Sequence, residues 1–159
     1  MIVSELRIKN YRNFQDFSIK LKGFTVIIGE NNIGKTNLLN AMGLIFSNEI
    51  SFFRRRTLSV DDINYDAIED FKRSIAALTI EVKDIVFPEV RVEADMTGFN
   101  PDQEAVVGDW FIDEELTTAR LPYVLSKRKD LTGWIQLQRS YIQSTQESII
   151  QKEGESALD

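Results

Sequence analysis

Cysteine and histidine are both absent from this chain of 159 residues. Their absence excludes a disulfide framework, thiol chemistry, zinc-finger ligation, a Ser-His-Asp triad and any imidazole acid or base. Any catalysis would therefore depend on carboxylates, lysine, hydroxyl groups, backbone amides or a bound ion.

The sequence also lacks a long hydrophobic run. No apolar segment approaches the roughly 20 residues needed to cross a bilayer. The first residues, MIVSELRIKNYRNF, alternate polar with apolar instead of forming the apolar block of a signal peptide. We therefore expect a cytoplasmic protein with no membrane partner. Its 43% of apolar residues suffice for the core of one ordinary soluble domain.

The net charge of -6 is unevenly distributed along the chain. Residues 1–60 carry nine Lys or Arg and four Asp or Glu, whereas residues 61–115 carry four and sixteen. The basic first third is suited to phosphate groups, and the acidic middle disfavours a polyanion.

Hydrophobic spacing predicts an ordered succession of elements in the first third. Residues 2–9 and 16–21 alternate polar with apolar side chains, which predicts two strands in an antiparallel hairpin. Residues 24–28 are β-branched and nearly continuous, as in a strand that is covered on both faces. Residues 37–46 place apolar side chains at helical spacing.

The later elements are predicted by the same rules. Asn100-Pro101-Asp102-Gln103 has the sequence of a capped helix start, and Pro122 favours an edge strand. We expect a short helix over 66–73, paired strands over 75–84 and 90–96, a helix from Asn100 to about 112, a strand over 119–125 with a hairpin partner over 134–138, and a polar tail over 139–159.

The stretch GENNIGKT, residues 29–36, fits the P-loop pattern G-x-x-x-x-G-K-[ST] between a predicted strand and a predicted helix. Glycines let the main chain curl with its N–H groups around a β-phosphate, and the helix presents its positive end to the same group. Lys35 would bridge the β- and γ-phosphates, and the Thr36 hydroxyl would bind Mg²⁺. The candidate nucleotide-binding residues are Gly29, Glu30, Asn31, Asn32, Ile33, Gly34, Lys35, Thr36 and Asn37.

Two stretches carry a resemblance to a known family. Residues 6–14, LRIKNYRNF, and residues 26–39, VIIGENNIGKTNLL, resemble the amino-terminal lobe of RecF/SMC-like, ABC-type ATPase heads. Within that group they are most similar to the OLD (overcoming lysogenisation defect) family of ATP-dependent nucleases, which includes a subunit of the Gabija phage-defence system. The resemblance implies an α/β P-loop NTPase fold, with a mixed sheet around the P-loop strand and an antiparallel β-rich flank.

The resemblance also implies partners and further site residues. Arg12 and Asn13 would lie near the nucleotide, where an arginine neutralises phosphate charge; the alternative is that both belong to a solvated hairpin turn. ATP and Mg²⁺ would be the cofactors, two heads would associate in the full-length protein, and DNA would be a partner in repair or phage defence. Arg54-Arg55-Arg56 is a candidate for DNA contact or, alternatively, a solvated run.

Parts of the family pattern are missing from this sequence. Hydrolysis in the family requires four apolar residues followed by Asp-Glu, and a signature loop from a partner head. The nearest match, residues 110–114 (WFIDE), follows a capped helix pattern, and we interpret it as a helix end with exposed acids. The chain therefore resembles one ATPase lobe over 1–159, a fragment of a longer protein or a protein completed by another chain. The lobe comprises the hairpin, P-loop strand and helix (1–47), a connection (48–74), a β-rich flank with one helix (75–138) and a polar tail (139–159).

Hydrolysis by this chain alone is not expected, and the parent protein would be an ATPase with an associated endonuclease. Two other functions stay open: a non-hydrolysing nucleotide-binding or interaction module, and a small P-loop kinase. The hairpin before the P-loop disfavours the kinase, because such kinases usually begin directly with the P-loop strand.

Overall fold

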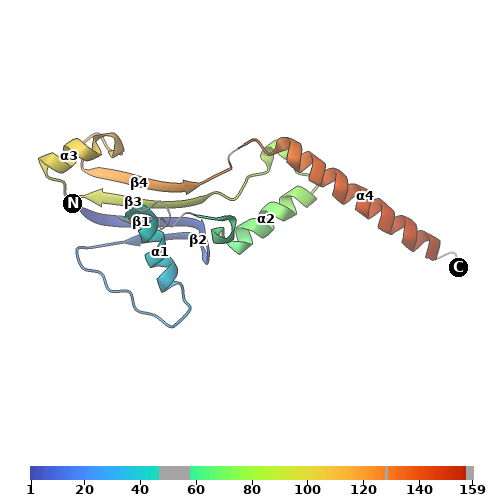
Figure 1. The fold of residues 1–159 in the computed structure, drawn as a ribbon, viewed down its shortest axis with the longest axis horizontal. Coiled ribbons are helices and arrows are strands. Elements are labelled where there is room, and N and C mark those ends of the chain that lie inside the picture. Colours follow the sequence, from blue (N-terminus) through green and yellow to red (C-terminus); the bar gives the residue numbers. More distant parts are fainter. Residues whose placement is uncertain (47–57, 128, 157–159) are drawn as a thin grey trace. The chain divides into compact units, whose positions relative to one another are not determined.

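A computed structural model describes residues 1–46, 58–127 and 129–156, with side chains to residue 149. The chain forms two compact units (Figure 1). The first comprises residues 1–67 and 89–126, and the second comprises residues 68–88 and the residues from 127 onward. The candidate P-loop belongs to the first unit.

A four-stranded sheet forms the first unit, in the order β2-β1-β3-β4. Its strands are β1 (Ile2–Tyr11), β2 (Phe14–Lys20), β3 (Val90–Thr97) and β4 (Thr118–Leu125). All neighbouring strands are antiparallel. The predicted hairpin is confirmed, and Pro122 lies on β4, at the edge of the sheet as expected.

One face of this sheet is apolar and carries the core. Leu6 and Ile8 of β1 and Val92 of β3 are almost fully buried. Helix α1 (Lys35–Phe46) contacts β1, β3 and β4 and buries Leu38, Ala41 and Leu44. The predicted helix is confirmed, and its packing on the sheet fixes the residues that precede it.

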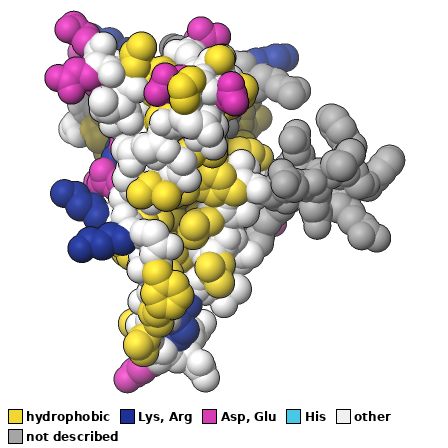
Figure 2. Space-filling view, turned by 90° about the vertical axis from the view of Figure 1, so that its left-hand side faces the viewer, with side chains coloured by type: hydrophobic (Ala, Val, Ile, Leu, Met, Phe, Trp, Pro, Cys, Tyr) yellow, Lys and Arg dark blue, Asp and Glu magenta, His cyan; other side chains and the backbone are white. Residues whose placement is uncertain are grey.

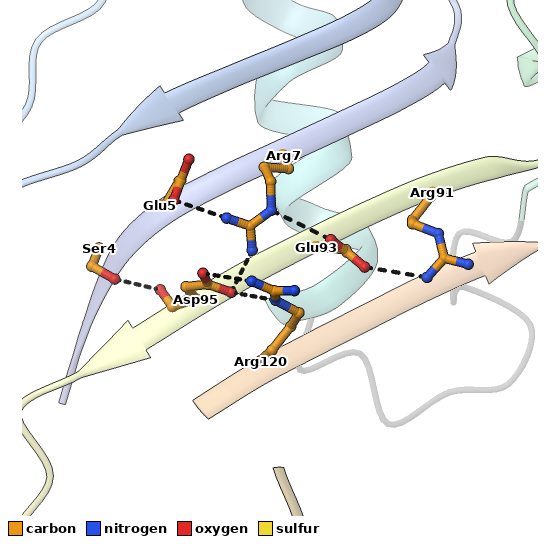
Figure 3. A network of polar contacts seen from close by, with 7 residues as sticks. All are labelled: Ser4, Glu5, Arg7, Arg91, Glu93, Asp95 and Arg120. Atoms are coloured by element: carbon orange, nitrogen blue, oxygen red, sulfur yellow. Dashed lines mark hydrogen bonds and ion pairs between the residues drawn. The ribbon is translucent and has the colours of Figure 1, made fainter. Parts of the chain in front are cut away.

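The opposite face carries a network of ion pairs (Figure 3). Asp95 on β3 is 6% exposed and accepts hydrogen bonds from Arg7 at 2.6 Å and from Arg120 at 2.8 Å. Glu93 accepts from Arg7 and from Arg91. Because the strand period is two, the residues that alternate with the apolar core meet across three strands as charged pairs.

The expected strand over 24–28 is not formed. These residues run as an extended loop between β2 and α1 (Figure 1), and Phe24 and Ile28 are 87% and 89% exposed. An apolar, β-branched run becomes a strand only beside a neighbour, and no strand among the described residues pairs with it. The expected mixed sheet is therefore wrong for this part of the chain, where the sheet is antiparallel. Figure 2 shows hydrophobic side chains that reach the surface.

The capped helix begins where the sequence predicts. In α3 (Pro101–Val107), Asn100 accepts a hydrogen bond from the Gln103 amide at 2.9 Å, and the Gln103 side chain accepts one from the Asn100 amide. The α-helix is shorter than predicted and continues as a 3₁₀ turn, η3 (Gly108–Trp110). Phe111 then bridges to Ala119 on β4, so the chain can no longer remain helical to residue 112.

Helices form the second unit. It contains most of α2 (Tyr65–Ala76), the 3₁₀ turn η2 (Val82–Asp84) and α4 (Thr132–Ser156). Its core is Ile75, Ile85 and Ile135. The helix expected over 66–73 is confirmed. The polar tail expected over 139–159 belongs to α4 as far as residue 156.

Two strands predicted for this region are wrong. Residues 75–84 comprise the end of α2, a turn and η2, and residues 134–138 belong to α4. The alternation in residues 75–84 reflects turns that place Ile80 and Val82 against the same small core. In α4, Arg139 donates hydrogen bonds to the carbonyl oxygens of Ser74, Ile75 and Ala77. These contacts hold the C-terminal end of α2 against α4.

None of the described helices is both long enough and apolar enough to span a bilayer.

Candidate nucleotide-binding site

Residues 29–36 form a loop that leads directly into α1, and we call it the glycine-rich loop. Asn32 and Gly34 have φ angles of +71° and +104°. These left-handed conformations turn the main chain sharply before the helix begins at Lys35. The Leu38 amide donates to the Gly34 carbonyl at 2.9 Å and closes the first helical turn.

Lys35 reaches back over its own loop. Its Nζ atom lies 2.6 Å from the Gly29 carbonyl oxygen and 2.5 Å from that of Glu30. The ammonium group therefore lies beside the loop and away from the apolar core. Glu30 contributes its main-chain carbonyl to this contact.

A hollow of about 200 Å³ lies between the loop and the first turn of α1. Its lining is mostly polar and includes Lys35 and Thr36. The residues around it are Asn31, Asn32, Gly34, Lys35, Thr36 and Asn37. A lysine, a hydroxyl group and the positive end of a helix suit a phosphate group.

Asn13 joins the first hairpin to this loop. Its side chain accepts a hydrogen bond from Asn37 Nδ2 at 2.8 Å and donates to the Ile33 carbonyl at 3.5 Å. The same amide lies so close to Gly34 that an added Cβ atom would collide with it. Gly34 is therefore required by both its φ angle and its neighbour.

Arg12 lies next to the same helix end. Its Nη1 atom donates to Asn37 Oδ1 at 2.9 Å, and its Nε atom donates to Asp62 Oδ1 at 2.8 Å. Arg12 has a φ of +50°, and its guanidinium carbon lies 5.3 Å from the centre of the Tyr11 ring. The structure thus brings Arg12 and Asn13 together with Asn37, and the hairpin turn is not merely solvated.

Two residues of the site were not identified from the sequence. Asp62 in η1 (Val60–Asp62) is 7% exposed and Asn64 is 4% exposed. The Arg12 amide donates to the Asp62 carbonyl at 2.8 Å, and Asn64 Nδ2 donates to the Arg12 carbonyl at 2.6 Å. Both residues fall in the connection expected over 48–74, where burial of these two polar side chains was not predicted. The sequence offers one hint that these positions are buried: both polar residues flank the apolar Ile63.

Thr36, where the Mg²⁺ site is expected, is one of the residues that line the hollow. No group of three or more acidic side chains among the described residues is arranged to hold a metal ion. One protein hydroxyl fits Mg²⁺ in a nucleotide complex, since this ion keeps several waters and takes other ligands from phosphate groups.

The Asp-Glu match at residues 113–114 lies in a loop. Asp113 accepts hydrogen bonds from the Thr117 amide at 2.7 Å and the Thr117 hydroxyl at 2.9 Å. Asp113 therefore closes the turn before β4, instead of ending a helix as expected. Arg54, Arg55 and Arg56 lie outside the described residues.

Comparison with known proteins identifies the family. A model of the AAA ATPase domain matches residues 1–156. The chain belongs to the AAA ATPase domain family. Membership confirms the expected α/β P-loop NTPase class and accounts for a glycine-rich loop ahead of α1.

Relatives of this AAA ATPase domain include nucleases and a repair protein. Endonuclease GajA of Bacillus cereus (strain VD045) is 36% identical over 93 residues, which cover 49% of this chain and 16% of GajA. The OLD nuclease of Thermus scotoductus is 32% identical over 65 residues, 41% of this chain and 12% of that protein. The DNA replication and repair protein RecF of Bacillus cytotoxicus is 49% identical over 43 residues, 26% of this chain and 12% of RecF.

These matches confirm the resemblance to RecF-like and OLD-like ATPase heads. The AAA ATPase domain described here spans less than a fifth of the length of each of these three relatives.

Proposed function

We propose that this chain is the ATP-binding lobe of a DNA-associated ATPase of repair or phage defence. The glycine-rich loop would bind the phosphates of ATP. The observation that carries the proposal is a polar hollow lined by Lys35 and the first turn of α1, with the Arg12 guanidinium hydrogen-bonded to Asn37, one of the lining residues. Each of these groups is positive or carries unpaired N–H donors, as a polyphosphate requires.

Each residue of the site would have its own role in binding ATP, set by its chemistry. Main-chain amides from Gly29 to Gly34 would surround the β-phosphate, and Lys35 would exchange the Gly29 and Glu30 carbonyls for phosphate oxygens. Thr36 would provide a ligand to Mg²⁺. Arg12 would add a second positive charge beside Asn37.

DNA association and the pairing of two heads belong to the proposal for the whole protein. They are supported by the similarity to an endonuclease, an OLD nuclease and a DNA repair protein. Hydrolysis by the chain alone is not expected, because among its described residues no apolar strand ends in Asp-Glu.

Titration with a fluorescent ATP analogue and Mg²⁺ tests the proposal. We expect saturable binding to the wild type, and at least tenfold weaker binding to Lys35→Ala, since a charge-assisted phosphate contact is lost. Lys20→Ala, which removes an exposed lysine from β2, is the matched control and should bind like the wild type. An equally weak signal for wild type and Lys35→Ala would contradict the proposal.

The contribution of Thr36 is tested by omitting Mg²⁺. We expect Mg²⁺ to strengthen binding to the wild type and to have little effect on Thr36→Ala. A Thr36→Ser variant keeps the hydroxyl and should retain the Mg²⁺ dependence, whereas equal dependence in wild type and Thr36→Ala would exclude Thr36 as a ligand.

A further inference from the structure

Asp62 is connected to the glycine-rich loop by a chain of hydrogen bonds. Its carboxylate accepts from Arg12 Nε at 2.8 Å, and Arg12 Nη1 donates to Asn37 Oδ1 at 2.9 Å. Asn37 Nδ2 donates to Asn13 Oδ1 at 2.8 Å. The Asn13 amide in turn donates to the Ile33 carbonyl at 3.5 Å. A buried acid outside the loop is thereby linked to the loop's main chain.

The two ends of the Asp62–Arg12 pair differ in exposure. The Asp62 side chain is 10% exposed and that of Arg12 is 30% exposed. The Nη2 group of Arg12 donates no hydrogen bond to any residue that the structure describes. The carboxylate thus fixes one edge of the guanidinium, while further N–H donors remain available beside Asn37.

We propose that Asp62 is a positioning residue for the nucleotide: it orients the Arg12 guanidinium at the first turn of α1, ready to contact phosphate. The inference rests on the proposed function and extends the site to a residue outside the P-loop pattern. Arg12 would contact the phosphate, whereas Asp62 would act on the nucleotide through Arg12.

Orientation matters because a long side chain loses conformational freedom when it binds. An arginine that is already held by a carboxylate loses less freedom on contact with phosphate. The planar guanidinium can donate to Asp62 and Asn37 at the same time, which a single ammonium group cannot do with the same geometry.

The carboxylate also has an opposing effect, because its negative charge reduces the attraction of Arg12 for phosphate. If charge dominated, removal of the Asp62 charge would tighten nucleotide binding. If orientation dominates, as we propose, the same change weakens binding. The sign of the effect therefore distinguishes the two.

Two main-chain anchors of the turn do not involve the Asp62 side chain. The Arg12 amide donates to the Asp62 carbonyl, and Asn64 Nδ2 donates to the Arg12 carbonyl. A third anchor does: the Ser59 amide donates to Asp62 Oδ2 at 3.1 Å, a bond that the side-chain oxygen of Asp62→Asn can still accept. Asp62→Asn leaves the first two bonds and the shape of residue 62 in place. It is thus suited to separating orientation of the guanidinium from folding of the turn.

A double-mutant cycle with the fluorescent ATP analogue and Mg²⁺ tests the inference. We expect Asp62→Asn to weaken binding about fivefold and Arg12→Gln about tenfold. The double variant should bind no more weakly than Arg12→Gln, because Asp62 acts through Arg12. Asp61→Asn, which neutralises the exposed neighbouring acid, is the control and should stay within twofold of the wild type. Wild-type or tighter binding by Asp62→Asn, or additive losses in the double variant, would overturn the inference.

Arg12→Lys provides a second test that leaves Asp62 intact. We expect it to bind as weakly as Arg12→Gln, since lysine keeps the charge but not the forked geometry. Wild-type affinity in Arg12→Lys would overturn the inference. Failure of the proposed function is recognised separately, because then wild type and Lys35→Ala would give the same weak signal.

Discussion

Arg120 on β4 donates two hydrogen bonds to Asp95 on β3, from Nε to Oδ1 at 2.8 Å and from Nη2 to Oδ2 at 3.1 Å. Arg7 on β1 donates to the same carboxylate at 2.6 Å. One buried acid thus joins three of the four strands of the sheet on its polar face (Figure 3).

Loss of this carboxylate should destabilise the first unit. Asp95→Asn leaves two arginines without their shared partner, and we expect a loss of about 2 kcal/mol. This is less than the 3–5 kcal/mol typical of fully buried pairs, because Arg7 and Arg120 are partly exposed. Urea unfolding measures the loss. Asp16→Asn, an exposed acid on β2, is the control and should change stability by less than about 0.5 kcal/mol.

The same acid predicts a dependence on pH. Burial alone would raise the pKa of Asp95, but the hydrogen bonds from Arg120 and Arg7 outweigh it and hold the pKa below its usual range. Its stabilising effect is therefore complete above the unfolded-state pKa of about 3.9, and is lost as the pH falls through the lower folded-state value. The stability difference between wild type and Asp95→Asn should shrink across that acidic range. A difference that is constant from pH 7 to pH 3 would contradict this assignment.

Substitution by alanine should have opposite effects on stability at Gly34 and at Gly43. Gly34→Ala forces a side chain into a φ of +104° and against Asn13, so we expect a loss of about 1–2 kcal/mol and of nucleotide binding. Gly43 lies inside α1 with nothing within 4 Å of an added Cβ atom. Gly43→Ala should raise stability by about 0.5–1 kcal/mol and leave binding unchanged. Thermal unfolding and analogue titration of both variants provide the comparison.

The Asn100 cap of α3 predicts a graded effect. Asn100→Ala removes the side-chain acceptor for the Gln103 amide and should cost about 1 kcal/mol. Asn100→Gly should cost only about 0.3 kcal/mol, because glycine is itself an acceptable N-cap. Equal losses in the two variants, measured from urea midpoints at unchanged slope, would exclude the cap as the cause.

Arg139 should stabilise the second unit through the end of α2. Its guanidinium donates to the carbonyls of Ser74 and Ile75, which lie in the last turn of α2, and to that of Ala77 just beyond the helix. We expect Arg139→Met to cost about 2 kcal/mol, with faster amide exchange at the end of α2. Arg73→Met, which removes only an exposed pair with Asp70, should cost less than about 0.5 kcal/mol.

Local patterns predicted a large part of the fold. The hairpin, α1, β3, β4 and the start of α3 depend on alternation, helical spacing or a cap, all of which are visible within about ten residues. The failures have a common physical reason. Residues 24–28 need a neighbouring strand that the described chain does not provide, and residues 134–138 alternate by chance within α4.

In the candidate site, too, some residues were predictable from local sequence and others were not. The P-loop pattern identified the loop because each of its residues has a local role, and the family resemblance added Arg12 and Asn13. Asp62 and Asn64 contact Arg12 across 50 and 52 residues of sequence. Such tertiary hydrogen bonds leave no periodic trace, so a single sequence could not reveal them.

The sheet order β2-β1-β3-β4 has a consequence for the folding pathway. The β1–β2 hairpin is local and can form within microseconds. In contrast, β1 and β3 must meet across a separation such as the 86 residues between Arg7 and Glu93. That encounter closes a chain loop containing the whole candidate nucleotide site, and non-local closures of this kind slow folding. We therefore expect the arrival of β3 to be the rate-limiting event, and the glycine-rich loop to acquire its fixed surroundings only afterwards.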